Sequence, residues 1–404
     1  MTGPAWRDGP GKGPRPVPAG PSWDVVVVGL GALGSAAAWA LARAGARVLG
    51  LEQFELGHHR GASHDHARII RRSYHTPGYV RLAGLAYGAW AELEGEAEER
   101  LLVTTGGLDL FPAGSAIPPG PYRASLEACG VPYRWLDAAE VMGRWPAFRL
   151  DPGVHGLWQA DAGIVPAAHG TRLLQRLARG HGATLLDRTP VTAVHDRGGW
   201  VEVATPDATF RAGRLVLCAD AWTGDLLAQL GADLPLVVTQ EQFSYFHPAD
   251  PDPFAVGRFP AWIWLDDPSF YGFPVWPDAA LKAAQDVGGP QVTAGTRGFD
   301  PDPAASARLA GFLRTRLPAA GAHDHTATCL YTLTPDRDFA LGPLPGHDHV
   351  LVGLGAAHGF KFAPLLGRVL ADLALHGGTE VDVSPFALDR PALATPDPEA
   401  SYLV

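Results

Sequence analysis

The chain has 404 residues, of which 47% are hydrophobic and 18% charged, and its formal net charge at pH 7 is -10. This length allows two domains, and the composition is typical of a globular protein with a large apolar core. The acidic balance argues against a nucleic-acid partner, because binding phosphates requires a basic face. No apolar run approaches the roughly 20 residues that span a bilayer, so we expect no membrane partner.

Proline and glycine dominate residues 1–22, which lack the apolar run of a secretory signal. We expect this segment to be a disordered tail. The three cysteines, Cys129, Cys218 and Cys329, are odd in number and far apart, which indicates neither a disulfide framework nor a zinc site. A reducing, cytoplasmic location fits this cysteine usage best.

A strand–helix–strand unit follows the tail. Val25–Val28 is an apolar, β-branched run without alternation, as in a parallel strand that is buried on both faces. Residues 33–44 place apolar side chains at helical spacing, and Gly45 ends this helix. A second strand is expected from there to Glu52.

The turn between strand and helix carries the pattern GxGxxG at Gly29, Gly31 and Gly34. Such glycines allow a tight turn, close approach of the backbone to a pyrophosphate, and close packing of helix on strand. The pyrophosphate then lies at the positive N-terminus of the helix. Glu52 stands where an acid hydrogen-bonds a ribose hydroxyl. The unit predicts FAD or NAD rather than NADP and leaves the choice between the first two open.

Beyond this unit the pattern departs from regular βαβ alternation. Helices are expected at 81–97 and 166–183, antiparallel strands at 236–276, and a strand, a glycine-rich turn and a helix at 349–375. Dinucleotide-binding pieces therefore occur at both ends, which favours an α/β flavoenzyme of two interleaved domains. We expect the FAD-binding domain at 23–90, 150–230 and 325–393, the substrate domain at 91–149 and 231–324, and a C-terminal tail at 394–404.

A histidine-rich stretch contains His58, His59, His64 and His66. No strand or helix spacing brings these side chains together and no cysteine joins them, so no metal site is predicted. Arg68 and Arg71 come directly afterwards. The planar fork of arginine suits carboxylates and phosphates, and a solvated basic turn is the alternative interpretation.

Four segments carry a family resemblance: DVVVVGLGALGSAAAWALARAG, GASHDHARIIR, CLYTLTPDRDF and AAHGFKFAPLLG. In order and spacing the chain resembles the monomeric sarcosine oxidase family, which includes the N-methyltryptophan oxidases, from Trp23 to about Leu393. The resemblance implies an α/β fold in which a glutathione-reductase-type Rossmann domain for FAD is interleaved with a substrate domain on a mixed or antiparallel sheet.

The resemblance also implies roles for single residues. Cys329 matches a cysteine bonded covalently to the 8α-methyl group of FAD, although a cysteine without this context is usually an inert core residue. Arg71 and Lys361 match the pair that grips the substrate carboxylate, which fixes one end of an amino acid. Arg68 matches an arginine packed against the flavin, and His358 would lie near its pyrimidine end.

Lys282 matches a lysine implicated in oxygen activation, where a positive charge stabilises reduced oxygen. Without the resemblance it would be interpreted as a solvated lysine. Tyr271 and Tyr331 match aromatic residues near the substrate. Taken together, the residues expected to bind the cofactor are Gly29, Gly31, Gly34, Glu52, Ser63, Arg68, Val191, Cys329, His358, Gly359, Phe360 and Lys361.

Two positions depart from the family pattern. Asp286 stands where many relatives carry histidine, and Ala357 stands where glycine is usual. An added methyl group in a pocket changes discrimination by about 1–3 kcal/mol. Asp286 either pairs with a substrate cation or lies at the surface. We therefore expect oxidase chemistry, but not sarcosine as the favoured substrate.

The sequence predicts a cytoplasmic, monomeric FAD-dependent oxidase of secondary amino acids, N-methylated or cyclic. The amine becomes an imine and oxygen becomes hydrogen peroxide, while the protein supplies orientation and charge. Activity should rise with pH, because an ammonium has no lone pair to assist hydride loss. The alternatives are a NAD-dependent dehydrogenase, a related flavin enzyme that acts on a larger amine or reduces quinone, and a flavoprotein that only binds its ligand.

Overall fold

The computed structural model describes residues 22–394. Its first sheet has eight strands, five of them parallel: β1 (Trp23–Val28), β2 (Val48–Leu51), β9 (Thr184–Leu186), β12 (Thr209–Leu217) and β20 (His347–Leu354). Antiparallel partners extend it, namely β10 (Ala193–Asp196), β11 (Val201–Ala204) and β19 (Ala340–Leu344). This is the mixed α/β architecture that the sequence predicted.

The valines of β1 show why this strand is central. Val25 and Val27 belong to one apolar cluster and Val26 and Val28 to another, and all four are buried. Successive side chains of a strand point to opposite faces of the sheet. An unbroken run of valine therefore fits a strand that is covered on both faces.

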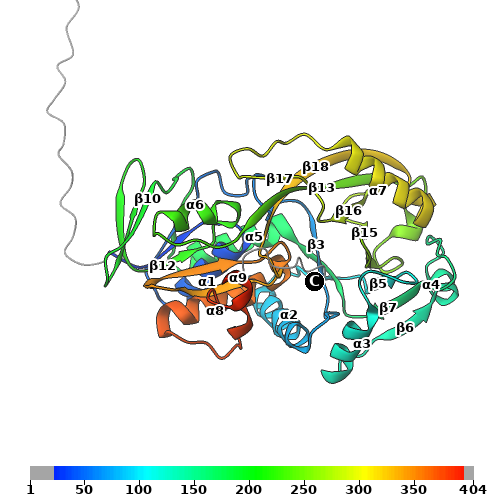
Figure 1. Cartoon of the computed structure of the whole chain (residues 1–404), viewed down its shortest axis with the longest axis horizontal. Coiled ribbons are helices and arrows are strands. Elements are labelled where there is room, and N and C mark those ends of the chain that lie inside the picture. Colours follow the sequence, from blue (N-terminus) through cyan, green and yellow to red (C-terminus); the bar gives the residue numbers. More distant parts are fainter. Residues whose placement is uncertain (1–21, 395–404) are drawn as a thin grey trace, which may run out of the picture.

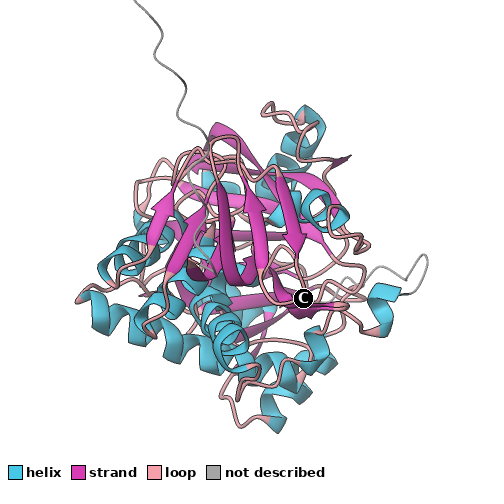
Figure 2. Cartoon of the chain, turned by 90° about the vertical axis from the view of Figure 1, so that its left-hand side faces the viewer, coloured by secondary structure: helices cyan, strands magenta, loops and turns pink. Residues whose placement is uncertain are grey.

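Three helices pack near β1. The helix α1 (Ala32–Arg43) contacts α5 (Ala167–Gly180) and α8 (Ala363–His376). Figure 1 shows α1 and α8 beside this sheet at one end of the molecule, and in Figure 2 helices lie along the lower side of the strands. The helix expected at 33–44 is confirmed with its N-terminus one residue earlier.

The second sheet has nine strands and occupies the other end of the molecule (Figure 1). Its order is β17-β13-β16-β15-β14-β5-β7-β6, with β18 beside β13. The strands are β5 (Gly107–Phe111), β6 (Arg134–Asp137), β7 (His155–Gln159), β13 (Val237–His247), β14 (Ala261–Trp264), β15 (Ser269–Val275), β16 (Leu281–Asp286), β17 (Gln291–Val292) and β18 (Ala322–Leu333).

The pairing in this sheet is antiparallel except between β14 and β5, which run parallel. The antiparallel strands expected at 236–276 are thus confirmed. Residues 155–159 and 325–333 pair here with strands of the segments expected to form the substrate domain. The division into two domains stays a prediction.

A small third sheet joins β3 (Ala67–Ile70), β4 (Val103–Thr104) and β8 (Gly163–Pro166). The remaining α-helices are α2 (Pro77–Ala97), α3 (Pro119–Ala128), α4 (Ala138–Arg144), α6 (Thr223–Ala228), α7 (Pro303–Arg316) and α9 (Pro391–Ala394). Short 3-10 turns lie at Asp220–Trp222, Asp252–Phe254, Pro318–Ala320, Gly359–Phe362 and Ser384–Phe386. None of the helices within 22–394 is long and apolar enough to cross a membrane.

The helix α2 begins earlier than the expected residue 81. Its N-cap is Thr76, whose side chain accepts a hydrogen bond from the backbone N–H of Tyr79, and Pro77 occupies the first turn. Threonine at the N-cap followed by proline is a strong start signal, because it satisfies backbone donors that the first turn leaves unpaired. The apolar spacing alone did not reveal it.

Candidate active site

Three cavities have volumes of about 220, 110 and 90 Å³: the first is lined from the first sheet, nearby helices and loops, and residues of β3 and of the second sheet contribute to the lining of the other two. The first and third share the lining residues Gly31, Ala62, Ser63, Cys218 and Asp220. The second and third share Arg68, Tyr331, Ala357 and Phe360. The three cavities therefore form one connected site, which starts at the carboxyl ends of β1 and β12, where ligands of α/β sheets bind.

The glycine turn lines the first cavity and leaves no room for side chains. A Cβ on Gly29, whose φ is +88°, would lie 2.4 Å from the carbonyl oxygen of Cys218. A Cβ on Gly34 would lie 1.8 Å from the carbonyl oxygen of Gly29. Gly31 faces the first and third cavities, and a Cβ there would lie 3.0 Å from Ser63 Oγ. Backbone is therefore exposed to a ligand at this turn.

The substitution Gly34→Ala is expected to destabilise the protein by about 3 kcal/mol or more, because the methyl group meets rigid backbone. Bound flavin should be lost with it. The matched control is Gly84→Ala in α2, where a Cβ meets nothing within 4 Å, and this change should stabilise the protein by about 0.5–1 kcal/mol. Urea unfolding measures the stability of the two variants, and absorbance measures their flavin content. Equal stability of the two variants would contradict the close packing at Gly34.

Glu52 lies at the end of β2 on the first cavity, where the sequence placed it. Its carboxylate accepts hydrogen bonds from the backbone N–H of Leu30 at 2.9 Å and of Phe54 at 3.1 Å, and it lies 3.4 Å from His58 Nε2. Burial alone raises the pKa of Glu52, but these contacts outweigh it and hold the pKa below its usual value. The ionised carboxylate therefore also orders the glycine turn.

Two polar atoms on the lining of the first cavity have no hydrogen-bond partner in the described part of the chain. They are Nε2 of His64 and Oδ2 of Asp220. Buried polar groups are normally paired, so both point to a polar ligand. Together with the glycine turn, Glu52, Ser63 and Val191, they fit the dinucleotide part of FAD.

Arg68 lines the second and third cavities and is held by backbone. Its guanidinium donates to the carbonyl oxygens of Ala62 at 2.7 Å, His64 at 3.0 Å and Ala67 at 2.9 Å. It lies 5.9 Å from the centre of the Phe360 ring. These contacts fix the position of its charge at the junction of the two cavities.

Arg71 lines the second cavity and forms a buried ion pair with Asp109 of β5, at 2.9 Å. The exposed fractions of the two residues are 5% and 3%, and Ser73 Oγ donates to the same Asp109 oxygen. Burial works against the Arg71 charge, but Asp109 outweighs it and raises the pKa of Arg71. Sequence reasoning missed Asp109, although an acid within the apolar segment GLDLF was a signal.

Lys361 lines the same cavity, and its backbone carbonyl accepts a hydrogen bond from Trp90 Nε1 at 2.8 Å. Its Nζ lies 5.6 Å from the centre of the Tyr74 ring. No carboxylate of residues 22–394 forms an ion pair with it. Burial, and then the nearby Arg71, lower the pKa of Lys361 to about 7. The Lys361 ammonium is therefore available to pair with an anionic ligand.

Binding of a carboxylate should weaken as the pH rises through about 7, because Lys361 loses its proton there. A titration of the flavin-loaded protein with a carboxylate ligand from about pH 6 to about pH 9 measures the dissociation constant. In Lys361→Arg, whose guanidinium keeps its charge, the dissociation constant should stay constant over this range. A constant value in the unaltered protein would rule Lys361 out as the titrating group.

Lys282 and Cys329 are buried near Arg68 and lie outside the linings of the three cavities as described. The Lys282 ammonium pairs with Asp65, which also accepts a hydrogen bond from the Tyr245 hydroxyl at 2.6 Å. Burial lowers the pKa of Lys282 to about 8, although Asp65 opposes the change. Burial raises the pKa of the Cys329 thiol to about 11, against the effect of Arg68.

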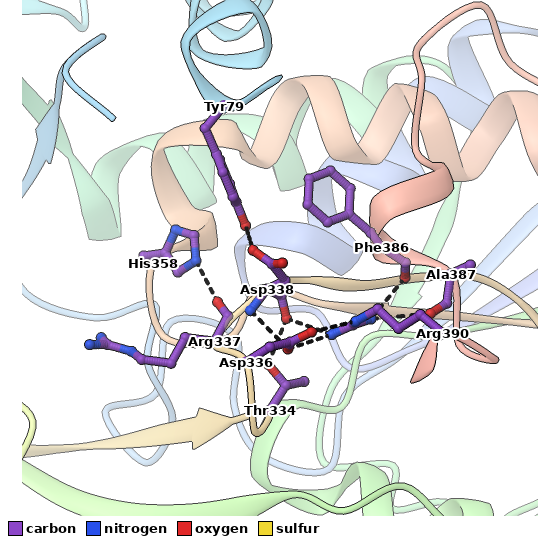
Figure 3. A network of polar contacts seen from close by, with 9 residues as sticks. All are labelled: Tyr79, Thr334, Asp336, Arg337, Asp338, His358, Phe386, Ala387 and Arg390. Atoms are coloured by element: carbon purple, nitrogen blue, oxygen red, sulfur yellow. Dashed lines mark hydrogen bonds and ion pairs between the residues drawn. The ribbon is translucent and has the colours of Figure 1, made fainter. Parts of the chain in front are cut away.

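The other expected site residues line the second or third cavity: Tyr271, Asp286, Tyr331, Ala357, His358, Gly359 and Phe360. Asp286 lies 3.2 Å from the guanidinium of Arg337, a residue that sequence reasoning missed. His358 Nε2 bonds the carbonyl oxygen of Arg337 at 2.9 Å, and burial lowers the pKa of His358 well below its usual value (Figure 3). The imidazole is therefore neutral.

No group of three or more potential metal ligands occurs in the described chain.

Comparison with known proteins identifies the family. Residues 24–373 match the family model described as FAD dependent oxidoreductase. N-methyl-L-tryptophan oxidase of Salmonella arizonae is 33% identical over 374 residues, covering 91% of this chain and 99% of that protein. Monomeric sarcosine oxidase of Streptomyces avermitilis is 34% identical over 383 residues, covering 93% and 99%.

The solved structures agree. NikD, described as an unusual amino acid oxidase essential for nikkomycin biosynthesis, superimposes in its open form with a TM-score of 0.83 and 31% identity, covering 91% of this chain and 98% of that one. The family match also decides between the two cofactors that the glycine pattern left open, in favour of FAD.

Proposed function

Because the chain belongs to the family of FAD-dependent oxidoreductases, we propose that it oxidises secondary amino acids and passes the electrons to oxygen. The observation that carries this proposal is Lys361, a half-buried cation beside Arg71 with no carboxylate partner among residues 22–394. The relatives named after N-methyl-L-tryptophan and sarcosine support it. N-methylated and cyclic amino acids are the proposed substrates.

The first cavity is proposed to hold the dinucleotide part of FAD, with Gly29, Gly31 and Ser63 at the pyrophosphate and Glu52 at the ribose. The third cavity, lined by Arg68, would hold the part that reacts. When bound, FAD supplies the two-electron chemistry, accepting a hydride from the carbon next to nitrogen and delivering the electrons to oxygen.

The residues of the second cavity position the substrate. Lys361 and Arg71 would bind its carboxylate, which aims the amine end toward the third cavity. His358 is neutral at ordinary pH and therefore does not protonate the substrate amine. A substrate that binds as the free amine keeps the nitrogen lone pair. Loss of hydride then gives an imine, which water hydrolyses, while oxygen with two electrons and two protons becomes hydrogen peroxide.

We propose that Cys329 Sγ forms a bond with the 8α carbon of FAD. The sulfur would replace one methyl hydrogen, and the two electrons and two protons released would pass to oxygen. Supporting observations are its position on β18 two residues from Tyr331, which lines the cavities, and its proximity to Arg68 and Lys282, which oppose the rise in its pKa that burial causes.

Acid precipitation should leave the yellow colour in the protein pellet, and Cys329→Ser should release it to the supernatant. Cys129→Ser is the control, because Cys129 is the C-cap residue of α3 and lies beside Pro77, and this variant should keep the colour in the pellet. Release from the unaltered protein would disprove the covalent bond while leaving the oxidase proposal intact.

Hydrogen peroxide production from a panel of N-methyl and cyclic amino acids tests the proposed function itself. Ala357 lines the second cavity with φ +70°, and its methyl group narrows the space that glycine would leave. We therefore propose a substrate other than sarcosine as the preferred one. From the cysteine usage and the family resemblance we also propose a monomeric, cytoplasmic enzyme. A flavin-loaded protein that yields peroxide with none of the panel would refute the proposal.

A further inference from the structure

The turn between β18 and β19 is held from both sides (Figure 3). Arg390 binds the Asp336 carboxylate at 2.7 and 2.8 Å, and the Tyr79 hydroxyl donates to Asp338 at 2.7 Å. Thr334 Oγ1 donates to the Asp338 carbonyl oxygen at 2.6 Å. These contacts fix Arg337 in the left-handed region at φ +60°, and its side chain points away from them.

The guanidinium of Arg337 lines the second cavity and is only 8% exposed. One of its terminal nitrogens lies 3.2 Å from Asp286. Its Nε is buried and has no hydrogen-bond partner in the described chain. Arg337 thus retains a donor for a ligand, although its charge is already paired.

Three arginines and one lysine line the second cavity. Each of its three arginines has an acid within ion-pair distance: Arg68 with Asp65 at 3.8 Å, Arg71 with Asp109 at 2.9 Å, and Arg337 with Asp286 at 3.2 Å. Asp65 also pairs with Lys282, so these two cations share one acid and keep one positive charge in excess. This excess lies at Arg68, which also lines the third cavity. On the substrate side Lys361 remains, with one positive charge and no acid of residues 22–394 as partner.

We propose that Asp286 is a specificity-determining residue that restricts this cavity to substrates with one carboxylate. It neutralises Arg337, which would otherwise hold a second carboxylate, and it repels an anion that approaches that arginine. Discrimination by a repulsive group against the wrong ligand is a general means of specificity. The inference rests on the proposed function, because it takes Lys361 and Arg71 as the site of the first carboxylate.

Two thioethers test this without turnover, because sulfur replaces the amine nitrogen that would be oxidised. (Methylthio)acetate carries one carboxylate and thiodiacetate carries two on the same framework. Their dissociation constants are measured with the flavin-loaded protein from the change in flavin absorbance. The unaltered protein should bind (methylthio)acetate at least tenfold more tightly, and this comparison requires no variant.

The substitution Asp286→Asn should change the ratio of the two dissociation constants by at least tenfold in favour of thiodiacetate. Adding Arg337→Gln to it should remove that gain, because the second carboxylate loses its donor. Asp286→Glu keeps the charge and should keep the original preference. Flavin content and circular dichroism verify that each variant is folded.

Equal binding of the two thioethers by the unaltered protein would overturn the proposal, and so would a ratio that Asp286→Asn leaves unchanged. Peroxide production separates this failure from failure of the proposed function. An enzyme that oxidises secondary amino acids but shows no such discrimination refutes only the role of Asp286. A protein that discriminates between the thioethers yet oxidises no amine supports that role and refutes the oxidase. Binding of neither thioether refutes the role of Asp286 together with the carboxylate site at Lys361 and Arg71, whereas the oxidase is still decided by peroxide production.

Discussion

Replacing Arg71 by leucine is expected to destabilise the protein by about 3–5 kcal/mol and to abolish carboxylate binding. The reason is Asp109, which is 3% exposed and pairs with Arg71 at 2.9 Å. Without the arginine its carboxylate would remain buried with a hydrogen bond from the Ser73 hydroxyl and without the cation that pairs with it. Truncating one member of a buried pair leaves an uncompensated charge, which costs more than the pair itself contributes.

The double substitution Arg71→Leu with Asp109→Leu separates stability from binding. Removing both charges should restore most of the lost stability, because a buried ion pair can be replaced by apolar residues at little cost. Carboxylate binding should remain absent. Urea unfolding and ligand titration of the three proteins measure the two effects. Full binding in the double variant would show that Lys361 suffices, and an unstable double variant would show that Arg71 has a wider packing role.

Replacing Lys282 by methionine is expected to slow the reaction with oxygen by about 100- to 1000-fold, a typical effect of removing one preorganised charge. Its ammonium is 2% exposed and is held by Asp65 and by the carbonyl oxygen of Ala67 at 3.2 Å. A charge fixed in this way needs no reorganisation when negative charge develops on oxygen.

Rapid mixing separates the two half-reactions of this variant. Loss of the flavin colour with substrate under anaerobic conditions should change little, whereas return of the colour with oxygen should become slow. Lys361→Met is the matched control and should show the reverse, weak substrate binding with a normal oxygen reaction. Equal slowing of both half-reactions in Lys282→Met would assign Lys282 a structural role through Asp65.

The strand–helix–strand unit could be predicted because its signals are local. The valines of β1, the glycines of the turn and Glu52 act through backbone conformation and burial within thirty residues of chain. The start of α2 at Pro77 was within reach of the same reasoning through Thr76. The family resemblance located Arg68, Arg71 and Lys361, and the cavities bring these three residues together.

Which acid pairs with which buried cation could not be predicted. Asp65 faces Lys282 of β16, Asp109 faces Arg71, and Asp286 faces Arg337, in each case from a different element of the fold. The hydrophobic periodicity of a strand indicates which of its faces is buried, but it does not indicate which other element packs against that face. Local signals in the chain therefore predicted a dinucleotide site, and the family resemblance indicated which cations are available, whereas packing of the sheets decided which of these cations are paired with an acid.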